Sequence, residues 1–176
     1  FNNILDSLGN NWVGFRSGEI DSDYQELSYI INTQNIEIVS NPYTILNDNS
    51  YYFAYREPYV LEISYQNNNF ILINIHYKCC NGSEDRRLQA SLLLHSYIST
   101  FFNDSKVIVL GDFNDLLIDD NNVFSPFLSD MNNFYFTDFT IANSSTALWS
   151  FPSWPSHLDH ILITNELFNY VIDTQT

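Results

Sequence analysis

The sequence predicts an α/β fold in which two packed, mainly antiparallel β-sheets are flanked by helices. Two observations support this prediction: a series of apolar runs of strand length, and one long amphipathic helix that separates two of the most apolar runs. The composition agrees, because 45% of the 176 residues are hydrophobic and 16% are aromatic, which is enough to bury a core. We therefore expect a single domain over residues 1–176.

The predicted elements follow one another in a simple order. The tail of a helix is expected at residues 1–8, and a short helix near residues 126–130. The clearest helix covers residues 84–102, where Leu88 and Leu92 mark one apolar stripe that neighbouring apolar residues broaden. The expected strands are residues 27–31, 36–39, 51–55, 59–65, 70–78, 107–110 and 158–163.

The run VIVLGDFND at residues 107–115 is the most informative motif of the chain. Asp112 and Asn114 follow the apolar strand at i and i+2, so in extended geometry their side chains leave the same face. A carboxylate beside a primary amide suits a hard divalent cation and the phosphate that it polarises. The same residues also suit an Asx-type turn. Taken alone, the motif leaves these two interpretations about even.

Two other strands carry polar residues near an apolar run. His76 closes the strand at residues 70–78, and Asp159 precedes the apolar part of the strand at residues 158–163. An isolated His at a strand end is more often structural than catalytic, and an isolated Asp there is usually a cap or turn acceptor. Three strands marked in this way within one small domain favour a shared site at a common rim.

Because of these motifs, the chain resembles the endonuclease/exonuclease/phosphatase superfamily, the metal-dependent phosphodiesterases related to pancreatic deoxyribonuclease. Four segments match in order: YREPYVLEI at residues 55–63, NIHYK at 74–78, GDFND at 111–115 and SHLDHIL at 156–162. They resemble the family's R-E-P strand, its N-x-H-x-K strand, its G-D-F-N-D signature and its S-x-x-D-[YRH]-I-L strand. The segment SFPSWP at residues 150–155 is similar to a bacterial branch of the family.

The resemblance covers roughly residues 54–168 and implies a four-layer α/β sandwich. It also implies phosphodiester hydrolysis with Mg²⁺ or Mn²⁺ as cofactor, most specifically an endonuclease acting on DNA. The site residues that it implies are His76, Asp112, Asn114 and Asp159 as catalytic residues, Asp112 and Asn114 as metal ligands, and Arg56 and Lys78 as phosphate-binding residues.

The resemblance also implies a role for each catalytic residue. Asp112 would orient or deprotonate the attacking water, and Asn114 would hold the phosphate or the metal. His76 would donate a hydrogen bond to a phosphoryl oxygen, and Asp159 would align a catalytic His or place a water. His157 shares a strand face with Asp159 and could reach the site, whereas His160 points the other way and is expected to be structural.

Two motifs of the family are absent from this sequence. Members open with an Asn-bearing strand and an L-Q-E motif whose Glu binds the metal, and they close with an S-D-H-x-P segment. The only Gln-Glu pair here, Gln25-Glu26, lies in a polar stretch. We therefore expect a fragment that is incomplete at both ends, lacking the first strands and the closing S-D-H motif. Such a fragment should be poorly soluble and inactive by itself.

The charge limits the range of partners. The formal net charge is −15 with only six Lys and Arg residues, whereas a nucleic-acid binder usually has a basic face. A small or exposed phosphodiester therefore suits the chain better than tight duplex binding, and DNA stays among the candidates. No apolar run is long enough to span a membrane. Cys79 and Cys80 are too few for a structural zinc site and are expected to be free thiols.

Two alternatives to a nuclease stay open. A phosphatase or a lipid-headgroup phosphodiesterase would use the same core residues with different rim loops. A catalytically inactive binding module would explain the absent motifs. Three N-x-S/T sequons, at Asn81, Asn103 and Asn143, are expected by chance in so Asn-rich a chain and leave open whether the protein is secreted or displayed on a cell surface.

Overall fold

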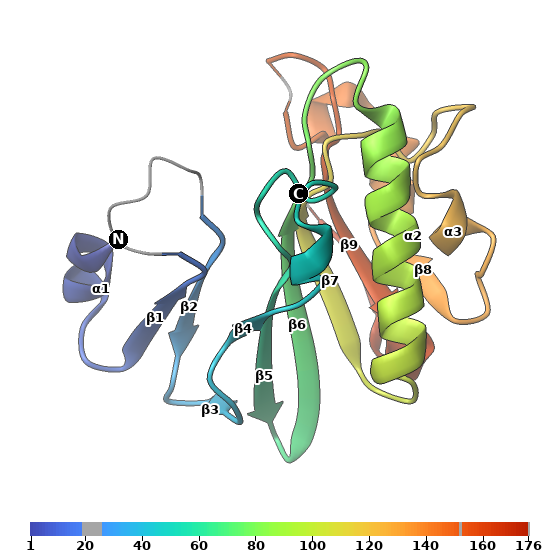
Figure 1. Ribbon diagram of the computed structural model, residues 1–176. Coiled ribbons are helices and arrows are strands. Elements are labelled where there is room, and N and C mark those ends of the chain that lie inside the picture. The colour runs from blue at the N-terminus through green and yellow to red at the C-terminus, as the bar shows by residue number, and fades with distance from the viewer. Residues whose placement is uncertain (19–25, 152, 176) are drawn as a thin grey trace.

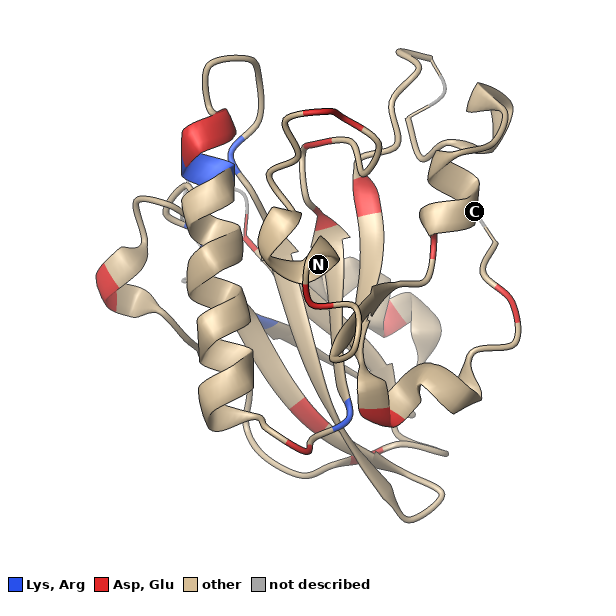
Figure 2. Ribbon diagram, turned by 90° about the vertical axis from the view of Figure 1, so that its right-hand side faces the viewer, with Lys and Arg blue, Asp and Glu red and all other residues tan. Residues whose placement is uncertain are grey.

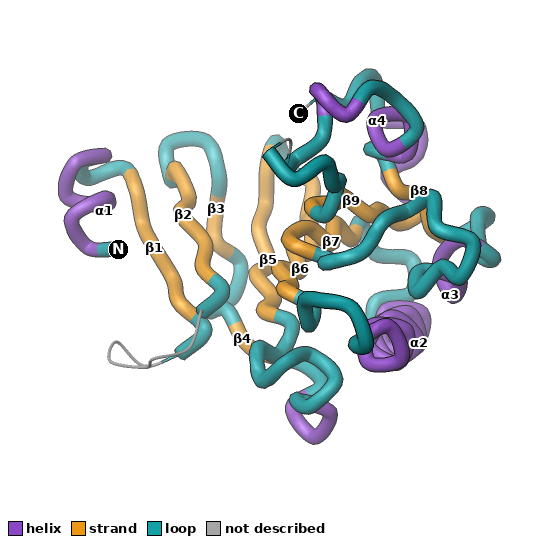
Figure 3. The backbone as a smooth tube through the Cα atoms, turned by 90° about the horizontal axis from the view of Figure 1, so that it is seen from above, coloured by secondary structure: helices purple, strands orange, loops and turns teal. Residues whose placement is uncertain are grey.

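A computed structural model describes residues 1–18, 26–151 and 153–175 (Figure 1). Helix α1 (Asn2–Leu8) lies outside a two-stranded sheet of β1 (Trp12–Arg16) and β2 (Ser28–Asn32). A seven-stranded sheet follows, and helices α2 (Glu84–Phe101) and α3 (Ser125–Leu128) cover its far face (Figure 3). The four layers confirm the predicted α/β sandwich.

The seven-stranded sheet has the order β3-β5-β6-β7-β9-β8, with β4 paired to β5. Strand β6 pairs antiparallel with β5 and parallel with β7, and β9 runs antiparallel to both β7 and β8. The single parallel pair requires a crossover, which α2 provides. The strands are β3 (Glu37–Ile38), β4 (Tyr43–Thr44), β5 (Tyr59–Tyr65), β6 (Asn68–His76), β7 (Val107–Asp112), β8 (Phe134–Phe136) and β9 (Asp159–Thr164).

Short helices complete the chain. They are α4 (Phe139–Ala142) and the 3-10 turns at Asn47–Asn49, Thr146–Leu148 and Asn165–Tyr170. Within the described ranges, no helix has the length and apolar character needed to cross a membrane.

Strands β5 and β6 of the large sheet are covered on both faces. On the helical side, Val60 of β5 belongs to a core cluster with residues of α2 such as Leu94. On the other side, Leu61 of β5 packs in a second cluster with Tyr29 of β2. Successive residues of a strand point to opposite faces, so a strand covered on both faces reads as an unbroken apolar run. This burial explains why β5 and β6 could be predicted from hydrophobicity, whereas β9 is apolar although its Ile161 is 39% exposed.

The strand predicted at residues 51–55 is wrong. These residues form turns closed by local hydrogen bonds, in which the Phe53 and Tyr55 amides donate to the Ser50 carbonyl. Ala54 and Tyr55 have left-handed φ values of 55° and 61°, which end any extended conformation. Strands β1, β4 and β8 were not predicted. Strands β4 and β8 are too short to show a clear period of two, and β1 (WVGFR) is half-buried throughout and shows no alternation.

Gly111 is required by the close approach of β7 to β6. Its φ is +137°, and a Cβ atom placed on it would lie 2.1 Å from the Ile75 carbonyl oxygen. The two residues are paired in the parallel ladder, so neither backbone can move without breaking the register. The glycine of the GDFND motif therefore allows β7 to pair with β6 at the end that carries His76 and Asp112.

We predict that Gly111→Ala lowers the free energy of unfolding by about 3 kcal/mol, because it adds a backbone clash to a disallowed φ. Gly82→Ala is the matched control. Gly82 also has a positive φ (+84°), but nothing lies within 4 Å of its added Cβ, so only about 1 kcal/mol should be lost. Urea denaturation of both variants measures the difference; equal losses would show that the approach of β6 is not the constraint.

Candidate active site

Three predicted site residues lie side by side at one end of the large sheet. The register pairs His76 of β6 with Asp112 of β7, and Asp112 with Asp159 of β9. The His76 Nε2 atom is 3.5 Å from the Asp112 Oδ2 atom. The structure therefore brings together side chains that lie 36 and 47 residues apart in the sequence, since the numbers run 76, 112 and 159.

Asn114 completes this row through a turn. Its φ is +55°, its backbone amide donates to the Asp112 Oδ1 atom at 2.9 Å, and its side-chain Nδ2 donates to the Tyr77 carbonyl at 3.0 Å. The Asx turn that seemed to be an alternative interpretation is therefore the device that places Asn114 beside the row. The turn and the candidate site are parts of one structure.

The two predicted phosphate-binding residues lie at the same rim. A pocket of about 490 Å³ is lined by Arg56, His76, Lys78, Asp112 and Asn114, together with Ala54, Tyr55, Cys79 and Arg86. Arg56 donates from Nη2 to the Tyr77 carbonyl at 3.2 Å, the same carbonyl that Asn114 uses. Asp159 is exposed beside Asp112 and lies just outside this lining.

Burial and neighbouring charges shift the ionisation of this row. Burial raises the pKa of Asp112, and the nearby Asp159 carboxylate raises it further, while the Asn114 amide and Arg56 act against this rise. Burial and the positive charge of Arg56 lower the pKa of His76 from its ordinary value of 6.5. His76 is therefore neutral at pH 7 and keeps one N–H group to donate.

The row fits a hard divalent cation. Asp112 supplies a carboxylate oxygen and Asn114 supplies an amide oxygen, which are the ligand types that Mg²⁺ and Mn²⁺ prefer. Burial and the Asp159 charge raise the Asp112 pKa, and a cation bound at Asp112 would offset the Asp159 charge.

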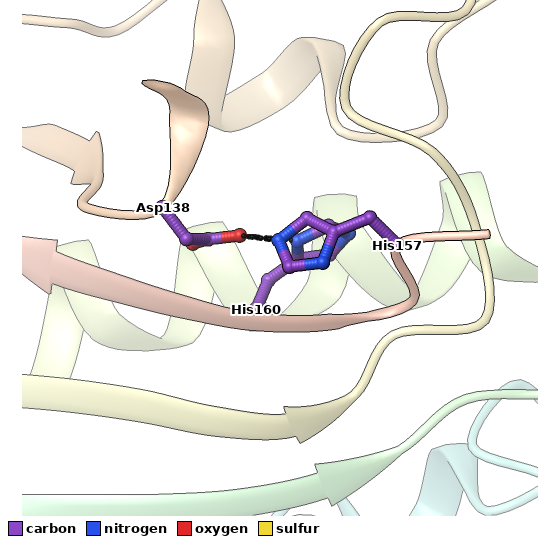
Figure 4. A group of neighbouring side chains, drawn as sticks. All are labelled: Asp138, His157 and His160. Carbon is purple, nitrogen blue, oxygen red and sulfur yellow. Dashed lines mark hydrogen bonds and ion pairs between the residues drawn. The ribbon is translucent and has the colours of Figure 1, made fainter. Parts of the chain in front are cut away.

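A second polar cluster is buried behind the row (Figure 4). Asp138 accepts hydrogen bonds on Oδ2 from His157 Nε2 at 2.8 Å and from His160 Nδ1 at 2.6 Å, and on Oδ1 from the Ile161 amide. All three side chains are at most 3% exposed. Their ligand atoms lie within 4.8 Å of one another, so the cluster could hold a metal ion. Two imidazoles and one carboxylate suit zinc better than Mg²⁺.

The hydrogen-bond partners of each histidine ring nitrogen in this cluster are identifiable. His157 accepts the Ser150 amide on Nδ1, so its single N–H is on Nε2 and points to Asp138. His160 contacts an oxygen atom with each nitrogen, the Asp138 carboxylate with Nδ1 and the Asp115 carbonyl with Nε2. Burial raises the pKa of Asp138, but the hydrogen bonds with His157 and His160 outweigh burial and lower this pKa below its ordinary value.

The expectation that His157 could reach the site is wrong, because its ring is directed to Asp138 in the interior. His160 is also buried, with its ring between Asp138 and the Asp115 carbonyl. Asp138 was missed because β8 was not predicted; the alternation Phe134, Phe136, Asp138 is the signal that would have placed its carboxylate inward. Of the Gln25-Glu26 pair, Gln25 lies outside the described residues, and Glu26 is paired with Arg16.

An α/β fold whose strand ends gather carboxylate, amide and imidazole groups beside basic side chains is typical of metal-dependent hydrolases of phosphate esters. The sequence matches the model of the endonuclease/exonuclease/phosphatase family over residues 20–175, and the chain belongs to this family. None of the curated proteins matches the sequence.

Solved structures share the fold. TDP2 from D. rerio, humanised by 14 mutations, is similar with a TM-score of 0.69 and 12% identity over 93% of this chain and 65% of that chain. D. rerio TDP2 with a single-strand DNA product has a TM-score of 0.65 and 13% identity, over 93% of this chain and 66% of that chain. A mannosyl-6-phosphatase from Bacteroides thetaiotaomicron has a TM-score of 0.61 and 14% identity, over 88% of this chain and 63% of that chain. The chain thus spans less than two thirds of each of these chains.

We predict that Asp138→Asn lowers the free energy of unfolding by about 3 kcal/mol at pH 7, because it removes a buried carboxylate oxygen that both His157 and His160 contact. Since the pKa of Asp138 is lowered on folding, its contribution is complete above the unfolded pKa of about 3.9 and is lost as the pH falls further. The difference between wild type and variant should shrink by about 1 kcal/mol at pH 3.

Asp130→Asn is the matched control. It breaks a pair with His95 at 2.9 Å whose side chains are 28% and 26% exposed, so it should cost less than about 1 kcal/mol. Denaturation at several pH values tests both variants. A difference for Asp138→Asn that stays constant down to pH 3 would contradict the lowered pKa.

Proposed function

We propose that this chain carries the catalytic site of a divalent-metal-dependent phosphodiesterase, most specifically a nuclease that cleaves DNA. The observation that supports the proposal is the row of His76, Asp112 and Asp159 beside a pocket lined by three of the six Lys and Arg residues, in a chain of net charge −15. Figure 2 shows how few basic residues lie among the acidic ones. A basic pocket in so acidic a chain selects a local anionic group.

The chain's own residues have distinct roles in this proposal. Arg56 and Lys78 bind the phosphate charge, and neutral His76 donates its N–H to a phosphoryl oxygen as negative charge develops there. Asp112 orients the attacking water or accepts its proton. A bound Mg²⁺ or Mn²⁺, held by Asp112 and Asn114, would polarise the phosphate and the water.

Asp159 acts beside this group. It is exposed and its backbone pairs with that of Asp112, so its carboxylate is free to place a water or to align a further histidine of the full-length protein. That alignment would fix the tautomer and orientation of the base, as carboxylates do in other acid–base pairs.

A phosphatase or lipid-headgroup phosphodiesterase is the second candidate. The strongly negative net charge favours it, because a chain with few cations cannot release many counterions from a long polyanion. One of the similar structures is a mannosyl-6-phosphatase. A phosphate monoester would use the same row of residues with one more negative charge on the substrate.

We predict that the full-length protein hydrolyses single-stranded DNA only with Mg²⁺ or Mn²⁺, and that excess chelator abolishes the activity. Asp112→Ala should lower kcat by at least about a thousandfold, because it removes both a metal ligand and the water-orienting carboxylate. Asp6→Ala removes a charge from the exposed helix α1 and should leave the rate unchanged.

The assay follows release of nucleotides from DNA, with sugar phosphates as the competing substrates. Metal-dependent cleavage of sugar phosphates without DNA cleavage would establish the second candidate. Full activity in chelator, or in Asp112→Ala, would refute the proposed site. Inertness toward every phosphate ester would favour an inactive binding module.

We further predict that residues 1–176 alone hydrolyse neither DNA nor a simple phosphodiester, because a cation held by one carboxylate and one amide should bind weakly. Assaying this chain beside the full-length protein with Mg²⁺ tests the expectation. Robust hydrolysis that depends on Asp112 would show that these residues suffice, and would turn attention to Glu26 as a metal ligand.

A further inference from the structure

Arg86 lines the candidate active-site pocket although no motif of the sequence contains it. It lies in the first turn of α2, across the pocket from the strand ends. Its guanidinium carbon is 4.0 Å from the centroid of the Tyr51 ring, and its Nη2 donates to the Tyr51 carbonyl. This stacking fixes the plane of the guanidinium.

Arg86 has unused hydrogen-bonding capacity. Its Nε atom is buried and has no acceptor among the described residues. Among the described residues, no carboxylate oxygen lies within 4.0 Å of the Arg86 guanidinium nitrogens, although the sequence has 21 Asp and Glu residues. By contrast, the adjacent Arg87 is buried and paired with Asp115. Arg86 is therefore a fixed cation whose position no internal ion pair explains.

The positively charged side chains that line this pocket repel one another. The charge of Arg86 contributes, after burial, to lowering the pKa of Arg56. Lys78 also lines the pocket, and its Nζ contacts only the Cys79 sulfur, at 3.6 Å, among the described residues. Such repulsion is relieved by an anion, and one phosphate next to His76 would occupy only part of a pocket of about 490 Å³.

The loop under Arg86 adds aromatic surface. Tyr51 and Tyr55 are 52% and 62% exposed, and their rings meet edge to face with centroids 6.4 Å apart. Tyr55 also lines the pocket, and the left-handed turn at Ala54 and Tyr55 leads directly into Arg56. Exposed aromatic rings beside fixed cations are the features with which proteins hold single-stranded nucleic acid.

We propose that Arg86, seated on Tyr51, forms a second phosphate subsite, which binds the phosphate next to the scissile one in a single-stranded oligonucleotide. Tyr55 provides a face on which the adjoining base stacks. This inference rests on the proposed function, because it takes the scissile phosphate to lie beside His76 and Asp112. It makes Arg86 a specificity-determining residue that separates oligonucleotides from substrates with one phosphate.

The test compares thymidine oligonucleotides with one and two phosphates, TpT and TpTpT. Binding to the full-length protein is measured by NMR titration at fixed salt, in excess chelator so that no hydrolysis occurs. We expect wild type to bind TpTpT about tenfold more tightly than TpT, the contribution of one charge-assisted contact. Arg86→Gln should bind TpTpT about tenfold more weakly than wild type and bind TpT with unchanged affinity.

Lys106→Gln is the matched control, since it removes one positive charge at the opposite end of β6, where Lys106 contacts Asn68. It should bind both oligonucleotides as wild type does. If Arg86→Gln fails to fold, Arg86→Lys replaces it and should lose about threefold for TpTpT only, because lysine keeps the charge without the planar fork.

Three outcomes would overturn the subsite: equal binding of TpT and TpTpT by wild type, equal losses for both ligands in the Arg86 variant, or no binding of either ligand. Hydrolysis with Mg²⁺ is measured separately. A TpTpT preference that depends on Arg86, without hydrolysis that depends on Asp112, would refute the proposed function and leave the subsite standing. The reverse result would refute the subsite alone.

Discussion

The ladder of β6, β7 and β9 is the constraint on which the candidate site depends. Its register sets His76, Asp112 and Asp159 in one row, and a slip of one residue would turn each of these side chains to the other face. Gly111 permits this register because it has no Cβ atom. A Cβ atom at this position would clash with the Ile75 carbonyl oxygen. The row is thus fixed by the backbone hydrogen bonds of three strands, and Arg56, Lys78 and Asn114 lie in the segments outside them.

Two buried side chains hold the end of the GDFND motif. The Arg87 guanidinium donates to the Asp115 carboxylate at 2.8 Å, and the His160 ring contacts the Asp115 carbonyl at 2.9 Å. Arg87 also donates to the Lys78 carbonyl, so it joins the end of the motif to the segment that follows β6. Because the Arg87 guanidinium is buried, separating it from Asp115 would leave an uncompensated charge in the interior. The Asp112–Asn114 turn therefore rests on a rigid base.

The basic residues are divided between structural roles and the candidate active-site pocket. The chain has few basic residues, and three of them serve structure: Arg16 pairs with Glu26, Arg87 pairs with Asp115, and Lys106 contacts Asn68 and two aromatic rings. The other three line the candidate active-site pocket. Acidic surroundings repel a long polyanion from the rest of the surface, so an anionic substrate is favoured at this one place.

The sequence by itself determined the elements whose signal is local. Apolar runs identified β5, β6, β7 and β9, and the polar residues at strand ends pointed to the site. The extent of α2 was predicted, but its stripe was misplaced, because Leu92 is 45% exposed and the buried face contains Ala90, Leu94 and Ile98. The tertiary structure decided what depends on distant contacts. The His160 ring contacts Asp138 and Asp115, 22 and 45 residues away, and the Arg86 guanidinium rests on Tyr51, 35 residues away. No local pattern records such contacts, because their free energy comes from groups that only the fold brings together.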